Sequence, residues 1–215
     1  MTKAQQINLF TGEPEIYTVE KDPIKSGLEE MEDRLFAKYK IKLTKIIKSL
    51  DSIGLPKVGE QYRLVTRRSF NAVELVQYIA TREKIVSLNM AIYSINFQAA
   101  TILIDLVDLG KIGKISIMMS NLRNKAHREK EVIIKEKFSK HPKISLFFCQ
   151  SHAKMMACKT EKDNFYGIEG SGNLAYNSRV EQYVIDNDKD IYDFSCRWMS
   201  EIKEFLKGKR ELEVC

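Results

Sequence analysis

The sequence has no long apolar run, no paired-cysteine motif and only three histidines. No segment approaches the roughly 18 consecutive apolar residues that a membrane-spanning helix requires. The N-terminus also lacks the charged-then-apolar pattern of a signal peptide. We therefore expect a cytoplasmic protein that does not act at a membrane.

The cysteines are four in number, lie far apart and form no Cys-x-x-Cys pair. A disulfide framework or a cysteine metal site is therefore not expected, and we predict neither a metal nor another cofactor. Two of the four stand in apolar surroundings, which is typical of reduced core residues. The four positions are Cys149, Cys158, Cys196 and Cys215.

The composition of the chain is typical of a soluble globular protein. Apolar residues make up 44% and charged residues 30% of the 215 positions, enough for one domain with a substantial core. The formal net charge of +6 makes a polyanionic partner plausible. That charge alone does not establish such a partner.

The chain divides by pattern into three parts. Residues 1–55 read as an arm followed by an amphipathic basic helix, because apolar residues recur at helical spacing from Leu28 to Leu50 while lysines fill the opposite face. That basic face suits either solvent or an anionic partner. Residues 56–208 read as the main folded domain and residues 209–215 as a tail.

In the central part, strand-like and helix-like segments alternate. This rhythm predicts an α/β fold with a mixed, largely parallel sheet and helices on both faces. Asn71, with Glu74 three residues later, is placed to cap the first of these helices. The expected strands are 62–66, 84–95, 114–120 and 143–149, and the expected helices are 71–83, 97–110, 124–141 and 191–206.

The segment after residue 150 reads as a hairpin with chemistry at both of its ends. In an extended strand His152 and Lys154 share a face, and the return arm ends in Gly170-Ser171-Gly172-Asn173. Two glycines around a serine make a tight bend whose backbone N–H groups can approach a phosphate. A lysine, a serine and an asparagine would bind its oxygens, and an imidazole can attack phosphorus. The ordinary alternative is a structural histidine beside a plain turn.

This pattern, "HAK…GSGNLAYNSRVEQ", resembles the H-x-K and G-S-x-N signature of the phospholipase D superfamily. The similarity extends over roughly residues 60 to 206. It implies that His152 is the nucleophile, that Lys154 and Asn173 bind non-bridging oxygens, and that Ser171 hydrogen-bonds in the phosphate pocket. By the same resemblance, Glu181 orients the imidazole, and Gly170 and Gly172 contribute to substrate binding.

The chain departs from the family pattern at one position. The family usually places Asp five residues after the lysine, where this chain has Lys159, and Asp163 in the turn is a possible substitute. The signature also occurs only once, and neither His127 nor His141 is a good second catalytic histidine. Because the family mechanism uses two histidines, the resemblance implies a homodimer with the active site at its two-fold interface.

The resemblance further implies a metal-independent phosphodiesterase, with nucleic acid, most plausibly DNA, as its substrate. Basic residues near predicted strand ends agree with this and include three candidate substrate-binding arginines, Arg67, Arg68 and Arg123. Two alternatives remain. One is a catalytically weak nucleic-acid-binding or targeting module, which Lys159 would favour. The other is a lipid or small-diester phosphodiesterase of the same superfamily.

Overall fold

The structure is a computed structural model of the 215-residue chain. It describes the residues 2–7, 14–19, 34–36, 39–46, 50, 53–67, 70–120, 125–172, 174 and 180–212.

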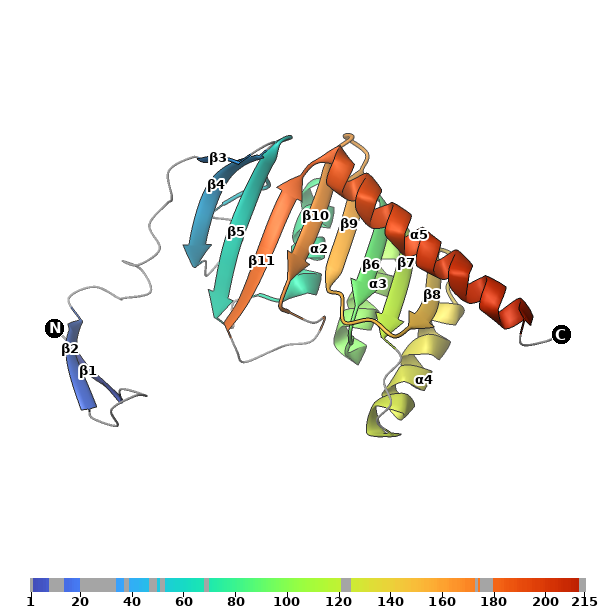
Figure 1. The fold of residues 1–215 in the computed structure, drawn as a ribbon, viewed down its shortest axis with the longest axis horizontal. Helices are drawn as coiled ribbons and strands as arrows, with labels where there is room; N and C mark the ends of the chain where they lie inside the picture. The colour runs from blue at the N-terminus through green and yellow to red at the C-terminus, as the bar shows by residue number, and fades with distance from the viewer. Residues whose placement is uncertain are drawn as a thin grey trace.

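The main feature is a nine-stranded sheet with the order β3-β4-β5-β11-β10-β9-β6-β7-β8 (Figure 1). A separate two-stranded sheet pairs β1 with β2. The strands are β1 Thr2–Ile7, β2 Pro14–Val19, β3 Arg34–Phe36, β4 Tyr39–Ile46, β5 Glu60–Arg67, β6 Ile85–Ile92, β7 Ile112–Ser120, β8 Ile144–Cys149, β9 Met155–Thr160, β10 Phe165–Gly170 and β11 Val180–Asn187. The helices are α2 Ala72–Arg82, α3 Phe97–Asp108, α4 Lys125–Ser139 and α5 Lys189–Leu212.

The sheet is mixed, as predicted, but not largely parallel. Parallel pairing joins β6 to β7, β7 to β8 and β4 to β5. The pairs β3–β4, β5–β11, β11–β10, β10–β9 and β9–β6 are antiparallel. The error arose because the β9–β10 hairpin and β11 lie in the centre of the sheet, so antiparallel strands separate β5 from the βαβ units.

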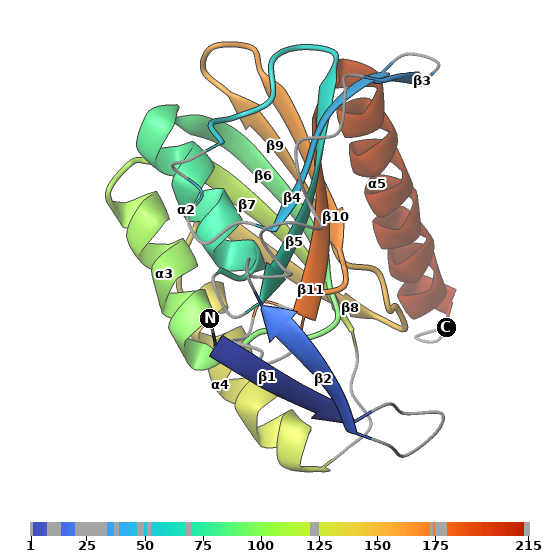
Figure 2. The ribbon, with the colours of Figure 1, turned by 90° about the vertical axis from the view of Figure 1, so that its left-hand side faces the viewer.

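Helices cover both faces of the sheet, which confirms that part of the prediction. Figure 2 shows α2, α3 and α4 on one side and α5 alone on the other. The larger apolar core lies under α2, α3 and α4. A smaller one, which includes Met118, Met155 and Met199, lies under α5. None of the described helices is both long and apolar enough to span a membrane.

The predicted helix ends are visible in the backbone. Asn71 caps α2 by accepting from the N–H groups of Val73 and Glu74, and the Glu74 carboxylate accepts from the Asn71 N–H in return. Asn96 caps α3 by accepting from the Ala99 N–H. After α3 the chain turns at Gly110, whose φ of +69° suits glycine.

The predicted basic helix between residues 28 and 50 is wrong where the structure describes the chain. Residues 34–36 and 39–46 form β3 and β4, and β4 runs parallel to β5. In "YKIKLTKI" the apolar Tyr39, Ile41 and Leu43 alternate with polar residues. That period of two is typical of a strand. The remaining residues of the predicted helix lie outside the described residues, as does most of the arm before it.

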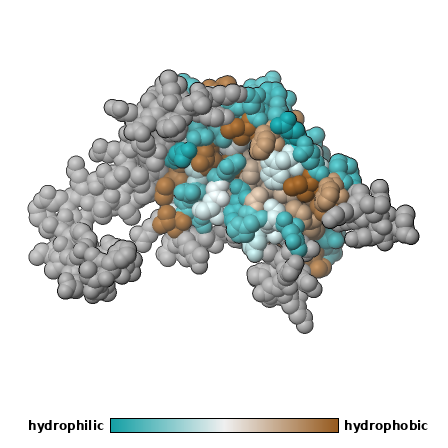
Figure 3. Space-filling model, in the orientation of Figure 1, coloured by the Kyte–Doolittle hydropathy of each residue, from teal (hydrophilic) through white to brown (hydrophobic). Residues whose placement is uncertain are grey.

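The last helix confirms the C-terminal prediction and extends it past Gly208 to Leu212. On the face of the molecule that α5 crosses, hydrophilic and hydrophobic residues are interspersed (Figure 3). Two phenylalanines of α5, Phe194 and Phe205, are exposed.

Candidate active site

The candidate site lies at one edge of the sheet, where the parallel strands β6, β7 and β8 end. Because β9 runs antiparallel to β6, with Met155 opposite Ala91, β9 begins at this same edge. β10 ends there and β11 begins there, because both are joined through antiparallel pairs. Ligand sites of open α/β sheets lie at the carboxyl ends of the parallel strands, and we call this edge the carboxyl edge.

The predicted hairpin is confirmed, and it brings its two ends together. The N–H of Gly170, at the end of β10, donates to the Lys154 carbonyl at 3.4 Å. His152 and Lys154 themselves lie in a loop, because β9 begins only at Met155. Within that loop the Ser151 hydroxyl accepts from the Ala153 N–H at 3.1 Å. The H-x-K loop and the Gly-Ser-Gly turn are therefore neighbours.

His152 is exposed and rests against an aromatic ring. The centroids of the Tyr93 and His152 rings are 4.7 Å apart, with 54° between the ring planes. The Lys154 ammonium lies 3.3 Å from Nδ1 of His152 and 5.7 Å from the centroid of the Tyr93 ring. Because an ammonium only donates hydrogen bonds, this contact requires Nδ1 to be the acceptor, which leaves the proton of a neutral imidazole on Nε2.

Ser171 and Glu181 are held to one another. The Ser171 hydroxyl donates to the carboxylate of buried Glu181 and accepts from the N–H of Gln182 at 3.1 Å. The N–H of Ser171 donates to the Gln182 carbonyl at 3.1 Å. The turn is therefore fixed to the start of β11. Among the described residues no hydrogen bond joins Glu181 to His152.

The two glycines of the turn are required by a tyrosine that packs beneath them. A Cβ on Gly172 would overlap the Tyr183 hydroxyl and lie 2.8 Å from Cζ of that ring, and a Cβ on Gly170 would lie 2.6 Å from its Cδ1. Tyr183 is only 2% exposed, and its ring lies 5.7 Å from that of Phe70. Its hydroxyl finds no hydrogen-bond partner among the described residues. Burial, followed by the carboxylates of Glu181 and Glu74, raises the pKa of this hydroxyl.

Several predicted site residues cannot be placed in the same detail. Asn173, Arg68 and Arg123 lie outside the described residues. Arg67 is the last residue of β5, paired with Val180, but its side chain is not described. The chain on the far side of the turn is anchored at Leu174, which forms a bridge with Ile95 and accepts from the Asn96 N–H at 3.2 Å.

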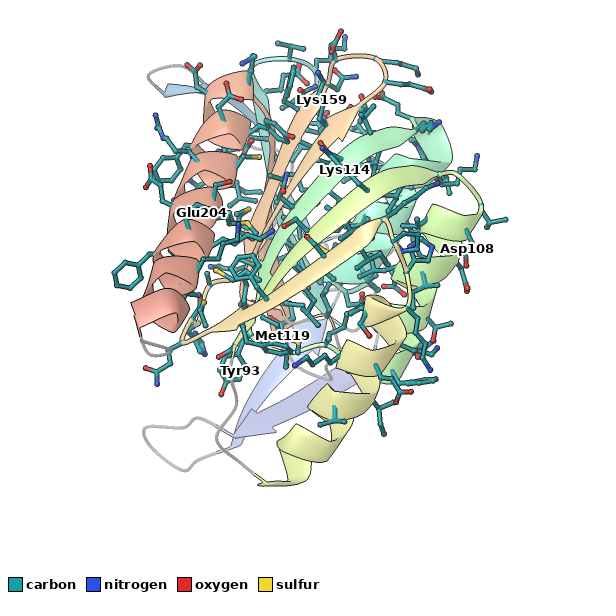
Figure 4. All side chains as sticks on the ribbon, turned by 90° about the vertical axis from the view of Figure 1, so that its right-hand side faces the viewer. Tyr93, Asp108, Lys114, Met119, Lys159 and Glu204 are labelled. Carbon is teal, nitrogen blue, oxygen red and sulfur yellow. The ribbon has the colours of Figure 1, made fainter. Side chains whose placement is uncertain are left out.

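Lys159 lies at the opposite edge of the sheet, which we call the amino edge. It is near the end of β9, roughly 13 Å beyond Met155 at about 3.3 Å per residue. Its ammonium lies 3.4 Å from the carboxylate of Asp163, which is itself 79% exposed. Figure 4 shows Lys159 and Tyr93 at opposite ends of the strands. Lys159 therefore lies at the other end of β9 from the loop that carries His152.

A different carboxylate anchors the amino edge. Glu83, which follows α2, accepts hydrogen bonds from the side chains of Thr160 at 2.7 Å, Asn164 at 2.8 Å and Tyr166 at 3.4 Å. Asn187 joins this network by donating to the Asn164 side chain at 2.9 Å. These bonds hold the β9–β10 turn against the end of α2.

The sequence reading missed two tyrosines at the carboxyl edge. Tyr93 was assigned to a strand but directly follows β6, and its position at the end of a parallel strand was a usable signal. Tyr183 occupies an inward position of β11, which reads as ordinary core, so no pattern marked it. Within the described residues no three His, Cys, Asp or Glu side chains come together as a metal site would require.

The strand order and the hairpin give the chain an α/β fold that is also found in solved structures. A solved structure with this fold is polyphosphate kinase from Porphyromonas gingivalis, with a TM-score of 0.53 and 14% identity over 67% of this chain and 26% of that one. The chain thus spans about a quarter of that enzyme.

Two further solved structures are similar at lower scores. The phospholipase D family member Nuc from Salmonella typhimurium matches 67% of this chain and 93% of its own, with 17% identity and a TM-score of 0.46. Yeast tyrosyl-DNA phosphodiesterase matches 57% of this chain and 28% of its own, with 12% identity and a TM-score of 0.28. No family model and no curated protein sequence matches the chain.

Proposed function

We propose that this protein is a metal-independent phosphodiesterase that cleaves nucleic acid, with His152 as its nucleophile. The observation that carries the proposal is the junction of the hairpin ends, where the Gly170 N–H meets the Lys154 carbonyl beside His152. The H-x-K loop and the Gly-Ser-Gly turn, far apart in the sequence, thereby form one surface at the carboxyl edge. A phosphate on that surface would meet an ammonium and an exposed imidazole.

The reaction proceeds in two displacements. An imidazole nitrogen of His152 attacks phosphorus, and the bond between phosphorus and the leaving oxygen breaks to give a phosphohistidine. A second histidine donates a proton to the leaving oxygen. That histidine, now neutral, takes a proton from a water whose oxygen attacks phosphorus and releases His152. The Lys154 ammonium neutralises charge on the non-bridging oxygens throughout.

The second histidine is supplied by dimerisation. Among the described histidines, His141 hydrogen-bonds to Asp108 at 3.0 Å, beyond the C-terminal half of α3 at the amino edge. It is therefore remote from the junction. A two-fold dimer that places His152 of the partner subunit opposite His152 completes the pair. Sedimentation should give about twice the chain mass of 24.9 kDa.

The test is cleavage of plasmid and of single-stranded DNA in excess EDTA, with wild type compared with His152→Ala. We expect nicking that survives EDTA and falls at least about a thousandfold in the variant, because the nucleophile is lost. His141→Ala is the matched control and should cleave as wild type does. Cleavage that persists in His152→Ala would show that the hairpin junction is not an active site.

One observation favours a second candidate. Among the described residues, Glu181 is bonded to Ser171, and no carboxylate is bonded to the His152 imidazole in the orienting role that the resemblance implies. A catalytically weak nucleic-acid-binding module would have the same structure. Folded, dimeric wild type that binds DNA but never nicks it would establish this candidate and exclude the enzyme.

A further inference from the structure

On the sheet face under α5, the side chains change from charged and polar at the amino edge to apolar toward the carboxyl edge. At the amino edge, Lys159 of β9 and Lys114 of β7 are the cross-strand neighbours of Ser87 on β6. Ile115 of β7 pairs with Ile144 of β8, so Lys143, one position before Ile144, lies beside Lys114 and extends this row to the edge of the sheet. The next row holds Ala157, Asn89, Ser116 and Ser145, and the third holds Met155, Ala91, Met118 and Phe147.

The third row and Ala157 of the second row are covered as a core, and Ser87 and Asn89 bond to Tyr192 and Cys196 of α5. Met118, Met155 and Phe147 pack with Met199 of α5 in the smaller apolar cluster. Toward β7 and β8, the first two rows border an open groove. Its lining is formed by Ser87, Leu88, Asn89, Lys114, Ile115, Ser116, Pro142, Lys143, Ser145 and Lys203. Among the described residues that line it, none is an acid.

The lysines of this groove are not neutralised from within. Neither Lys114 nor Lys143 has a carboxylate within 4.0 Å among the described residues, whereas the ammonium of Lys140 lies 2.8 Å from the carboxylate of Glu136 and that of Lys207 lies 2.7 Å from that of Glu204. Like charges on directly opposite strand positions destabilise a sheet. The pair Lys114 and Lys143 is therefore not explained by folding stability.

Lys203 adds a third positive charge from the helix side of the groove. Its ammonium lies 5.6 Å from the Phe147 ring centroid, so the stem of the side chain lies over the apolar row. The hydroxyls of Ser116 and Ser145 add donors between the ammonium groups. Ammonium groups and hydroxyls set side by side can each donate a hydrogen bond to a phosphate oxygen, as lysines and serines do in contacts with the backbone of nucleic acid.

We propose that this lysine groove, formed by Lys114, Lys143 and Lys203, binds the phosphate backbone of nucleic acid. It gives the proposed nuclease, on whose substrate the inference rests, a second contact far from the cleavage site. Along β7, Lys114 lies roughly 20 Å from Ser120, the last residue of the strand at the carboxyl edge. That length corresponds to about six base pairs at 3.4 Å each. Figure 4 shows Lys114 and Tyr93 in the strip between α5 and the opposite helix layer.

The experiment measures binding of a fluorescent 20-base-pair duplex by fluorescence anisotropy between 50 and 200 mM salt. His152→Ala is the background, so that cleavage does not interfere. Adding Lys114→Gln and Lys143→Gln should weaken binding roughly tenfold at 100 mM salt and reduce the salt slope of log K by about two. The control pair Lys140→Gln and Lys207→Gln removes the same charge from lysines that are already ion-paired, and should change the slope by less than about 0.5.

A second readout separates this inference from the proposed function. With His152 restored, the groove variant should hydrolyse bis(p-nitrophenyl) phosphate as wild type does, because that diester is too short to reach the groove. Unchanged duplex binding in the groove variant, or an equal loss in the control pair, overturns the groove while EDTA-resistant cleavage by wild type still stands. Tripolyphosphate binding that depends on the groove, together with unchanged duplex binding, overturns nucleic acid as the ligand.

Discussion

The two ends of the β9–β10 hairpin differ in how they use polar groups. At the amino edge, Glu83 has an exposed fraction of only 11% and accepts from Thr160, Asn164 and Tyr166. At the carboxyl edge, His152 is exposed, and the Lys154 ammonium lies 3.3 Å from the Nδ1 atom and 3.5 Å from the carbonyl oxygen of His152. One end satisfies its polar groups internally, and the other presents them to solvent.

Within a single hairpin, one end therefore stabilises the fold and the other holds the residues of the candidate site. A buried, fully bonded network fixes the strands in register, since leaving any of its members unpaired is costly. The opposite end can then hold an ammonium and an imidazole side by side without contributing to the fold. Each of the following predictions perturbs one of the two ends.

The largest effect is expected from Gly172→Ala at the carboxyl edge. The new methyl group would overlap the buried Tyr183 hydroxyl, so the Gly-Ser-Gly turn must move away from Lys154. We expect diester hydrolysis to fall at least about a hundredfold, because small displacements of positioning groups have large catalytic costs. Steady-state hydrolysis of bis(p-nitrophenyl) phosphate measures this.

The same steric overlap predicts that a second substitution, at Tyr183, restores the activity lost in Gly172→Ala. Adding Tyr183→Leu removes the overlapping atoms and should restore activity to within about tenfold of the Tyr183→Leu single variant. Circular dichroism establishes that each variant is folded. Gly172→Ala with wild-type activity would show that Tyr183 does not position the turn.

At the amino edge, Glu83→Ala should cost stability instead of activity. It leaves the side chains of Thr160, Asn164 and Tyr166 without their common acceptor, and we expect the free energy of unfolding to fall by about 2–4 kcal/mol. Urea denaturation measures it. Glu83→Gln keeps one acceptor oxygen and should cost less. A loss of kcat at unchanged stability would contradict the division between the two ends.

A second buried acid near the amino edge predicts a pH dependence. Asp186 is 3% exposed. Burial, followed by the charge of Glu169, raises its pKa to about 7, against the opposing effect of the Gly167 N–H. In the unfolded chain this carboxyl has its ordinary pKa of 3.8, so it ionises there first as pH rises. Stability due to this group is therefore full below about pH 4, falls between about 4 and 7, and stays low above.

Asp186→Asn should remove this dependence. At pH 8 we expect the variant to be more stable than wild type by up to a few kcal/mol, and at pH 4 to differ little. Thermal unfolding at the two pH values measures the difference. The same gain at both values would mean that the effect does not come from ionisation.

The smallest effect is expected from Lys159→Asp, which restores the residue usual in the family. Because Lys159 lies near the far end of β9, hydrolysis of a small diester should change less than about twofold. A tenfold gain in kcat/KM would show that the two edges communicate.

The sequence alone was enough to predict the local helices and strands and to locate the motif. Asn71 and Glu74 predicted the start of α2, and the spacing of H-x-K and G-S-x-N predicted a hairpin that joins His152 to the turn. It did not reveal the central position of the hairpin in the sheet, because pairing between distant strands leaves no periodic trace. The contact between Gly172 and Tyr183 was hidden for the same reason, since only the register of β10 and β11 brings them together.

The strand order also bears on how the chain folds. Thr66 of β5 pairs with Glu181 of β11, about 115 positions later. At roughly 5–20 residues per second, β5 and α2 would leave the ribosome about 6–20 seconds before that neighbouring strand is made. We expect the βαβ units and the hairpin to assemble first. The proposed catalytic surface would then form only when β11 arrives, because β11 carries both Glu181 and Tyr183.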